Sequence, residues 1–343
     1  MLKLHMLKSE KFCKKNFICI VLVGIALICA ICIWKIDKVY GVIKEVKESI
    51  HRELEYYTMH KKMVDISELP ALSDENDAWY TKYHFIAHAG GGVEGRIYTN
   101  SLEAWENSYQ KGNRVFDADM AFTSDGEMVL RHEWDENLEL DNYSMREGSH
   151  YIDEFNGHTQ YIYKMPEKKQ VSYEEFMKSR IFYKYTPMSC DDMIRFMKKH
   201  DDLYVACDMK GDMKKAYQYL VKKAYELSSE SILDRIIVNI YDHESYDSIL
   251  EIYPFKNVTV RQHYWCSNNY YELVDFCLRN NIHVVNISSY YMEDEGVELL
   301  MTKGIHVYVA VVDYISDMND YYRLGADGAV TNWLYEDDWK YIQ

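Results

Sequence analysis

The sequence predicts an α/β fold: a TIM (β/α)8 barrel over residues 81–343, with an N-terminal transmembrane helix and an insertion after the second strand region. Short runs rich in β-branched and aromatic residues alternate with amphipathic segments, which is the order of a parallel sheet covered by helices. Eight such repeats over this length fit a closed barrel. A doubly wound open sheet is the alternative, although it usually has fewer strands.

The individual elements follow from these two periodicities. The predicted strands are 84–88, 115–120, 204–209, 236–241, 258–263, 283–288, 306–312 and 328–331. The predicted helices between them are 101–111, 191–200, 213–227, 245–252, 270–280, 295–303 and 317–324. Residues 133–187, rich in Tyr, Glu and Lys, fit no strand–helix unit. We expect an insertion that covers the barrel mouth, although a passive decoration would have the same composition.

Residues 17–34, FICIVLVGIALICAICIW, carry no charge. At about 1.5 Å per residue the run spans roughly the hydrocarbon thickness of a bilayer. A cleaved signal peptide would need a shorter apolar core and a small-x-small cleavage site, and Trp34 and Lys35 follow instead. Five lysines precede the run, so residues 1–16 are predicted to be cytoplasmic and the body extracellular. The expected location is the cell membrane, with a single pass.

Residues 35–80 are predicted to form a juxtamembrane helix and a linker. Apolar residues recur there at heptad spacing: Ile36, Val39, Ile43, Val46 and Ile50. Two heptads are fewer than a stable coiled coil normally needs. A solvated stalk helix and a weak homodimer seam both remain open.

Composition excludes one class of partner. The chain has a net charge of −16 and no basic stripe interleaved with aromatic residues, so binding to nucleic acid is not expected. Eight cysteines are spread too widely for a dense disulfide framework. Whether the cysteines of the body pair is not decided by the sequence.

Charged residues stand at the ends of two predicted strands. Asp117 and Asp119 are two residues apart, so both side chains point to one face, which in a barrel is the lumen. Adjacent carboxylates repel each other, and a divalent cation such as Ca²⁺ or Mg²⁺ relieves that repulsion. Asp208 and Lys210 repeat the spacing on the third strand, where the lysine could meet an anionic phosphate. Either pair alone would also suit a solvated strand end.

Two histidines occupy comparable positions. His88 follows the first strand and precedes Gly90 to Gly92 after one alanine, and His132 ends the run VLRH. The glycines permit close approach of a ligand or simply mark a sharp turn. Each histidine alone is more typical of a hydrogen-bonded structural residue. Their convergence with the acidic residues at the carboxyl ends of predicted strands favours an active site.

Five segments together resemble one family: HAGGG, TNSLEAWENSYQKG, FDADMAFTSDGEMVLRHEWD, CDMK and GADGAVTN. They are similar to those of the glycerophosphodiester phosphodiesterases, relatives of the phosphatidylinositol-specific phospholipases C. The resemblance spans residues 83–332 and implies a TIM barrel with a divalent cation, Ca²⁺ or Mg²⁺. It implies that His88 and His132 are the acid–base pair. It places Asp117, Asp119 and Asp208 at metal-ligand positions, with Lys210 and Asn100 at substrate-binding positions.

This sequence departs from the family pattern at several positions. Ala89 stands where the family usually has a phosphate-binding arginine, and Thr99 stands where it has a glutamate. Asp117 and Asp208 are one methylene shorter than the usual glutamates. Residues 310–313, Ala-Val-Val-Asp, replace an aromatic-Thr-Val-Asn motif and suggest an altered pocket.

The function expected from these residues is that of a membrane-anchored, metal-dependent hydrolase. It would cleave glycerophosphodiesters to an alcohol and glycerol phosphate, with the two histidines as acid and base. The alternatives are a lipid-directed phosphodiesterase, such as a lysophospholipase D or a polyglycerol-phosphate hydrolase, and a non-catalytic barrel that binds glycerophosphates.

Overall fold

The computed structural model describes residues 65–132, 134, 150–155, 158–163, 170–261, 270–289, 292 and 294–343; for 150–155 and 158–163 it describes the backbone alone. The predicted cytoplasmic segment, transmembrane run and stalk helix lie outside these residues. In the part of the chain that is described, no helix combines the length and apolar character needed to cross a bilayer.

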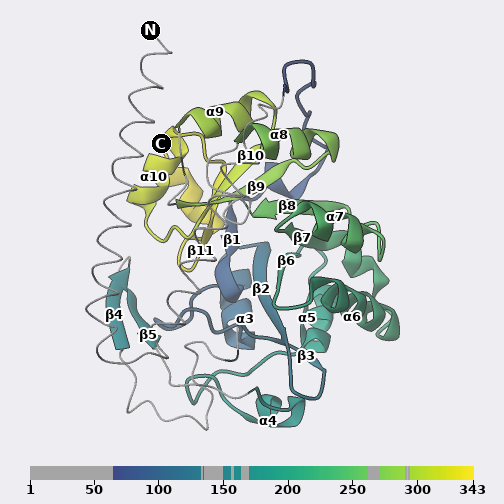
Figure 1. Cartoon of the computed structure of the whole chain (residues 1–343). Coiled ribbons are helices and arrows are strands. Elements are labelled where there is room, and N and C mark those ends of the chain that lie inside the picture. Colours follow the sequence, from purple (N-terminus) through teal and green to yellow (C-terminus); the bar gives the residue numbers. More distant parts are fainter. Residues whose placement is uncertain are drawn as a thin grey trace, which may run out of the picture. The chain divides into compact units, whose positions relative to one another are not determined.

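Eight parallel strands form the predicted closed barrel (Figure 1). Going round the barrel, they are β1 (Phe85–Ala87), β2 (Val115–Phe122), β6 (Tyr204–Met209), β7 (Ile236–Ile240), β8 (Asn257–Arg261), β9 (Val284–Ser288), β10 (His306–Ala310) and β11 (Gly328–Thr331). Strand β1 pairs with both β2 and β11, which closes the cylinder. The open doubly wound sheet is thereby excluded, and each strand lies within a few residues of its predicted range.

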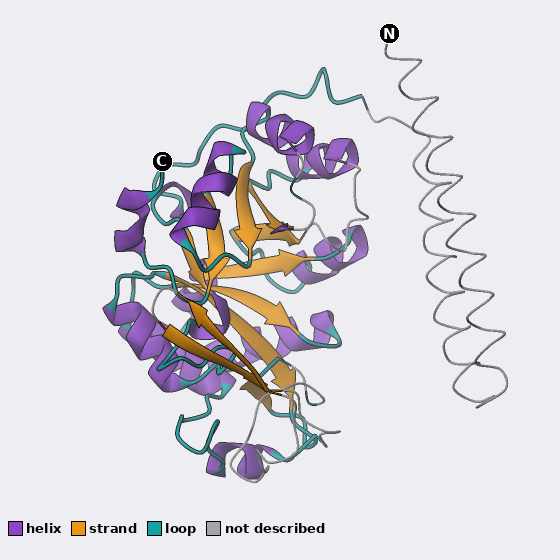
Figure 2. Ribbon diagram, turned by 90° about the vertical axis from the view of Figure 1, so that its left-hand side faces the viewer, coloured by secondary structure: helices purple, strands orange, loops and turns teal. Residues whose placement is uncertain are grey.

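Helices form the outer layer around the strands (Figure 2). They are α3 (Leu102–Gln110), α5 (Cys190–Lys199), α6 (Met213–Glu226), α7 (His243–Leu250), α8 (Tyr270–Arg279), α9 (Asp294–Thr302) and α10 (Ile315–Arg323). Short polar residues begin several of them. The Ser101 hydroxyl accepts a hydrogen bond from the Ala104 amide, and Ser189 forms a reciprocal capping box with Asp192.

The second strand is longer than predicted, and the chain reverses direction after it to form a short antiparallel strand. It continues to Phe122, and β3 (Met128–Leu130) then pairs antiparallel with it, Met120 opposite Leu130. The described parts of the insertion form a hairpin of β4 (His150–Phe155) and β5 (His158–Tyr163), followed by α4 (Tyr173–Lys178). At its end, Phe176, Phe182 and Tyr185 pack against Val93 and Ala104, so this part lies beside the connection from β1 to α3.

The strand pleat divides the core into two parts. Alternate residues such as Phe116, Ala118 and Met120 of β2 pack outward in the cluster shared with the helices. Residues on the opposite face, among them Ile86 and Val115, belong to a separate cluster inside the barrel. Asp117 and Asp119 lie between the outward residues of β2, so their side chains face the lumen, as the i, i+2 spacing predicts.

The chain enters the barrel at its amino-terminal end, or bottom. The Leu72 amide bonds to the Lys303 carbonyl, and the Lys303 ammonium donates to the carbonyls of Ile66 and Leu69. The 3-10 helix η1 (Trp79–Thr81) then places Trp79 in the lumen cluster, with its ring 5.4 Å from the ring of Tyr308. Residues 65–81 therefore close the bottom of the barrel and leave the carboxyl ends of the strands as the mouth.

Candidate active site

Three carboxylates meet at the mouth on adjacent strands. Asp117 and Asp119 come from β2, and Asp208 comes from β6, where it is in register with Asp119. The side chains of Asp117 and Asp119 are each 1% exposed and that of Asp208 is 15% exposed. Buried carboxylates need compensating partners, because an isolated buried charge is strongly unfavourable.

Two cations from different strands supply that compensation. The Lys210 ammonium lies 3.0 Å from Asp208 Oδ2 and 3.4 Å from Asp119 Oδ1. Arg261, the last residue of β8, reaches across the lumen, and its Nη2 lies 3.1 Å from Asp117 Oδ1. The structure thus brings together Asp117, Asp119, Asp208 and Lys210, and it adds Arg261.

Neutral polar groups complete the cluster. The Asn100 side chain donates from Nδ2 to Asp119 Oδ2 at 2.9 Å and accepts from the Asp119 amide at 3.2 Å. Both ends of the buried Asn100 amide are therefore used to position Asp119 in this arrangement. Asn100 has a φ of 48°, a left-handed conformation that asparagine tolerates better than most residues. The Tyr241 hydroxyl donates to Asp208 Oδ1.

The surroundings lower the pKa of Asp208 and raise the pKa values of Lys210 and Arg261. Burial raises the pKa of Asp208, but Arg261, Lys210 and the hydrogen bond from Tyr241 outweigh it and bring that pKa to about 2. Burial lowers the pKa of Lys210, but Asp119 and Asp208 outweigh it and hold the pKa above its usual value. Burial also lowers the pKa of Arg261, but Asp117, together with Tyr241, Asp208 and Asp119, outweighs burial and raises that pKa. Asp208, Lys210 and Arg261 are therefore all charged near neutral pH.

His88 lies at the mouth end of β1, in the short 3-10 helix η2 (His88–Gly90), and is 9% exposed. Its Nδ1 is 3.1 Å from Asn332 Oδ1, and Asn332 Nδ2 donates to Asp313 Oδ2 at 2.8 Å. A carboxylate only accepts, so Asp313 fixes the orientation of the Asn332 amide and leaves its oxygen facing the histidine. The His88 proton consequently sits on Nδ1, and Nε2 is the nitrogen left for a substrate.

The glycines after His88 allow the chain to make a sharp turn. Gly90 has a φ of 83°, and a Cβ there would lie 2.3 Å from the Trp105 ring. The Gly90 carbonyl accepts from the Ser108 hydroxyl at 2.7 Å, and the Gly92 amide donates to the Asn332 carbonyl at 2.7 Å. Of the two interpretations of the glycine run, the structure therefore supports the sharp, tightly packed turn.

His132 was expected at the carboxyl end of a barrel strand, and this placement is wrong. It lies two residues beyond β3, which pairs antiparallel with β2 and is not a barrel strand, and it is half-buried. The amide of the preceding residue, Arg131, donates to the Asp119 carbonyl at 2.8 Å. This bond holds the backbone before His132 alongside the acidic part of β2. Its role as the second acid–base group stays a prediction.

Three residues of this site were not predicted from the sequence: Arg261, Tyr241 and Asn332. Asp313 was noted only as the end of the altered motif at residues 310–313. The sequence could have indicated the direction of the Arg261 side chain. Arg261 lies two residues after Thr259 in a predicted strand, so the two side chains point to the same face of the sheet. The Asp313–Asn332 contact joins the ends of two strands that the local sequence cannot pair.

The donor chemistry of the three aspartates fits a hard divalent cation. Asp119 Oδ1 in addition is buried without a hydrogen-bond partner among the described residues, although Lys210 is nearby. However, each carboxylate faces Arg261, Lys210, Asn100 or Tyr241. In the described part of the chain, no three His, Cys, Asp or Glu side chains are arranged to hold a metal ion. A cation at these residues would therefore have to displace one of the present partners.

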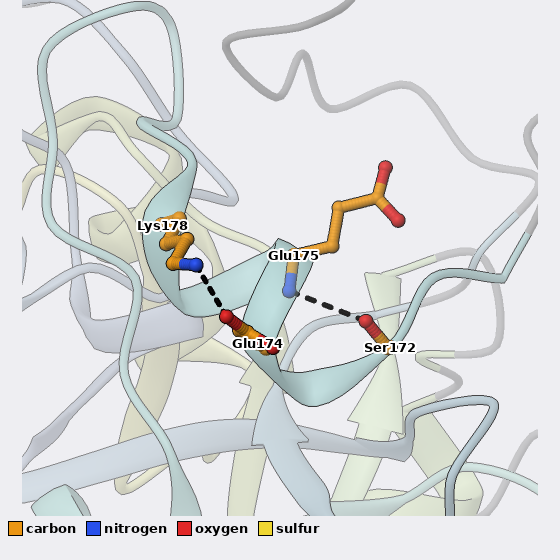
Figure 3. A pocket seen from close by; sticks show the side chains of 4 residues that line it. All are labelled: Ser172, Glu174, Glu175 and Lys178. Atoms are coloured by element: carbon orange, nitrogen blue, oxygen red, sulfur yellow. Dashed lines mark hydrogen bonds and ion pairs between the residues drawn. The ribbon is translucent and has the colours of Figure 1, made fainter.

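A surface hollow elsewhere has different properties. It has a volume of about 360 Å³ and lies on α4, lined by Ser172, Glu174, Glu175 and Lys178 (Figure 3). Its contacts are a helix-capping bond from the Glu175 amide to Ser172 and an ion pair between Lys178 and Glu174, both exposed. Ordinary helix capping and surface pairing explain these residues, and none of them belongs to the charged cluster at the mouth.

Comparison with known proteins identifies the fold. No family model matches this sequence, and no curated protein is detectably similar to it. Among solved structures, a phosphodiesterase from Oleispira antarctica in complex with the product sn-glycerol-3-phosphate aligns with a TM-score of 0.56 at 13% identity, covering 77% of this chain and 98% of that chain. A glycerophosphodiester phosphodiesterase from Parabacteroides distasonis aligns with a TM-score of 0.53 at 14% identity, covering 76% and 96%. The chain shares the barrel fold of these phosphodiesterases.

Proposed function

We propose that this protein is a phosphodiesterase that hydrolyses glycerophosphodiesters to an alcohol and glycerol phosphate. The observation that carries the proposal is the site itself: a histidine with a fixed tautomer beside three carboxylates and two cations, at the mouth of a barrel shared with known phosphodiesterases. A barrel of this kind has its chemistry at the carboxyl ends of its strands.

The reaction needs two proton transfers. In the proposal, one histidine takes a proton from the attacking oxygen, which is the substrate's own glycerol hydroxyl or a water molecule. As the new P–O bond forms, the P–O bond to the alcohol breaks, and the other histidine gives a proton to the departing alkoxide. Attack by water gives glycerol phosphate directly, whereas attack by the glycerol hydroxyl gives a cyclic phosphate, which a water molecule then opens to glycerol phosphate. The contact of Asn332 with Nδ1 keeps His88 Nε2 in position for one of these transfers.

The chain's own cations act on the phosphate. Lys210 is 18% exposed at the mouth and carries its charge there, so it can attract the phosphoryl oxygens. Asp117, Asp119 and Asp208 would hold a divalent cation, Ca²⁺ or Mg²⁺, which when bound neutralises negative charge on the phosphoryl group. Tyr241 and Asn100 keep two of these carboxylates in place.

We further propose that residues 17–34 anchor the enzyme in the cell membrane with the barrel outside. The charge-free run and the preceding lysines support this placement. An anchored barrel would meet substrates released at the membrane, so a lysolipid or a polyglycerol phosphate is the second candidate substrate. Full-length protein should stay in the membrane fraction after extraction with alkaline carbonate, and complete release would contradict the anchor.

The acid–base assignment is tested with H88A and H132A in the full-length protein. Each variant should lower turnover of a chromogenic phosphodiester by roughly 10³-fold, the usual contribution of a positioned acid or base. H200A is the matched control, because His200 is the C-cap residue of α5, outside the cluster. Turnover within twofold of wild type in H88A or H132A would contradict the assignment.

Two further measurements separate the remaining alternatives. EDTA should abolish turnover and excess Ca²⁺ or Mg²⁺ should restore it, whereas full activity in EDTA would remove the metal from the proposal. Product analysis with glycerophosphocholine and with a lysolipid distinguishes the two substrate classes. Tight binding of glycerol phosphate without turnover of any diester would instead indicate a non-catalytic barrel.

A further inference from the structure

A chain of hydrogen bonds crosses the barrel lumen and ends in an unpaired acceptor. It begins at the Cys207 carbonyl of β6, which accepts from Asn239 Nδ2 of β7 at 3.1 Å. Asn239 Oδ1 accepts from the Thr259 hydroxyl of β8 at 2.8 Å, and the Thr259 oxygen accepts from Asn286 Nδ2 of β9 at 3.3 Å. Asn286 is 3% exposed, and its Oδ1 has no hydrogen-bond partner among the described residues.

This chain fixes which atom of the Asn286 amide is left over. A carbonyl oxygen only accepts, so Cys207 orients the Asn239 amide with its oxygen towards Thr259. The single hydroxyl proton of Thr259 is then used by Asn239, and Asn286 meets the hydroxyl oxygen with its NH₂ group. The remaining Asn286 atom is therefore an acceptor, and a buried acceptor without a donor is unfavourable.

A buried donor without a partner occurs at the paired position of the neighbouring strand. Arg261 of β8 is in register with Asn286 of β9, and it shares the lumen face with Thr259, two residues earlier. Arg261 Nη2 pairs with Asp117 Oδ1 at 3.1 Å, whereas Arg261 Nε is buried without an acceptor among the described residues. Arg261 Nε and Asn286 Oδ1 thus lie on adjacent strands at one level of the barrel without bonding to each other.

The chemistry of these two atoms selects the group that can bridge them. Arginine Nε only donates, and the asparagine oxygen only accepts. A phosphate oxygen would satisfy the arginine but would be repelled by the amide oxygen, and an ammonium group would have the opposite mismatch. A hydroxyl group accepts one hydrogen bond and donates another, so it satisfies both atoms.

We propose that Asn286 and Arg261 form a hydroxyl-binding subsite that takes an alcohol hydroxyl of the substrate's glycerol unit. The hydroxyl donates to Asn286 Oδ1 and accepts from Arg261 Nε. This inference rests on the proposed function, since it assigns the specificity of that site for glycerol. A ligand without the hydroxyl leaves both buried atoms unpaired, and a site built to bind a hydroxyl rejects such analogues for this reason.

The test compares N286L with N257L in the full-length protein. Leucine keeps the branched shape of asparagine and removes the acceptor. Asn257 is the first residue of β8, where its Nδ2 donates to the Asp234 carbonyl at 2.9 Å, so N257L makes the same exchange at the opposite end of the barrel. Calorimetry measures binding of sn-glycerol 3-phosphate and of ethyl phosphate, which carries the phosphate but no hydroxyl.

The ratio of the two affinities reports the subsite. Wild type and N257L should bind sn-glycerol 3-phosphate roughly five- to tenfold tighter than ethyl phosphate, and N286L should bind the two within about twofold of each other. A wild type that binds both ligands equally would overturn the subsite. An unchanged ratio in N286L would also overturn it, and this is the result expected if a water molecule permanently bridges the two atoms.

A second variant covers a failure of N286L to fold. N286A also removes the acceptor and places a smaller side chain in the lumen, so the affinity ratio should fall in the same way. A ratio in N286A equal to that of the wild type would overturn the subsite.

These binding measurements are independent of turnover. Hydrolysis of glycerophosphocholine by the wild type together with an unchanged ratio in N286L would reject the subsite alone. A ratio that is lost in N286L, without hydrolysis of any diester by the wild type, would reject the enzyme and keep the subsite.

Discussion

The two ends of the barrel use buried side chains in opposite ways. The mouth holds charged groups from strands far apart in the sequence, and two of their buried atoms, Asp119 Oδ1 and Arg261 Nε, have no hydrogen-bond partner among the described residues. The bottom is filled by aromatic rings: Trp79 and Tyr80 come from the entering chain and meet Tyr308 inside the lumen. The mouth therefore offers charged groups that can interact with a ligand, whereas the aromatic packing at the bottom stabilises the closed barrel.

The largest expected effect concerns the bottom. W79A removes a side chain that is 2% exposed and should lower the free energy of unfolding by about 3–5 kcal/mol, through lost burial and the cavity left behind. Urea unfolding followed by circular dichroism measures it, and W79F should lose less. Turnover per folded molecule should stay within twofold of wild type. A W79A protein that is stable but inactive would contradict the claim that the bottom of the barrel contributes to stability and not to activity.

At the mouth, D117A should destabilise the protein by about 3 kcal/mol, because it leaves the Arg261 guanidinium buried without its carboxylate. The same urea unfolding measures the loss. The double variant D117A/R261Q should recover part of it, since the unpaired cation is then absent. If D117A unfolds like wild type, the buried pair does not contribute as described.

The third prediction concerns the mouth alone and tests whether Asp313 fixes the orientation of His88 through Asn332. D313A removes the acceptor that fixes the Asn332 amide and should lower kcat by roughly tenfold with little change in KM. The ¹⁵N chemical shifts of the His88 ring report the tautomer directly: Nδ1 should carry the proton in wild type, and D313A should show a mixture. A wild-type tautomer in D313A with reduced kcat would contradict positioning through Asn332.

The smallest effect is a pH dependence at the bottom. His306 lies between Asp74, at 2.8 Å, and Asp327, at 3.2 Å. Burial lowers its pKa, but the two carboxylates outweigh burial and raise the pKa to about 9. Since the folded pKa exceeds the unfolded value, the stabilisation is complete below about pH 6.5 and is lost as the pH rises through 9.

Asp74 and Asp327 are both partly exposed, so solvent screening limits this stabilisation to about 1–2 kcal/mol. Unfolding free energies measured between pH 6 and 10 should fall by this amount in wild type and stay flatter in H306Q. A parallel fall in both proteins would assign the pH dependence to other groups.

Most of the barrel could be predicted because its elements carry local signals. The strand β6 has its predicted bounds, and α5 is preceded by the N-cap residue Ser189, which forms a capping box with Asp192 three residues later. The antiparallel return of β3 was missed as a separate strand. Its three residues are too few to show an alternating pattern, and pairing with Met120 to Phe122 defines it.

The site was predicted in part, for a similar reason. Asp117, Asp119, Asp208 and Lys210 were found because two residues at i, i+2 share a face, and the structure brings them together. Arg261 stands alone at the end of its strand, so the sequence gives no sign of the carboxylate that it meets. Asp313 and Asn332 are likewise joined only because β10 and β11 end side by side.

The sequence by itself determined which residues form the eight barrel strands and which of their side chains face inward, because hydrophobic periodicity and pleat are properties of a few neighbouring residues. Only the tertiary structure decided which inward-facing groups meet: Arg261 with Asp117 across the lumen, and Asp313 with His88 through Asn332. Those contacts depend on how the closed barrel sets its strands against one another, and no short stretch of sequence encodes that register.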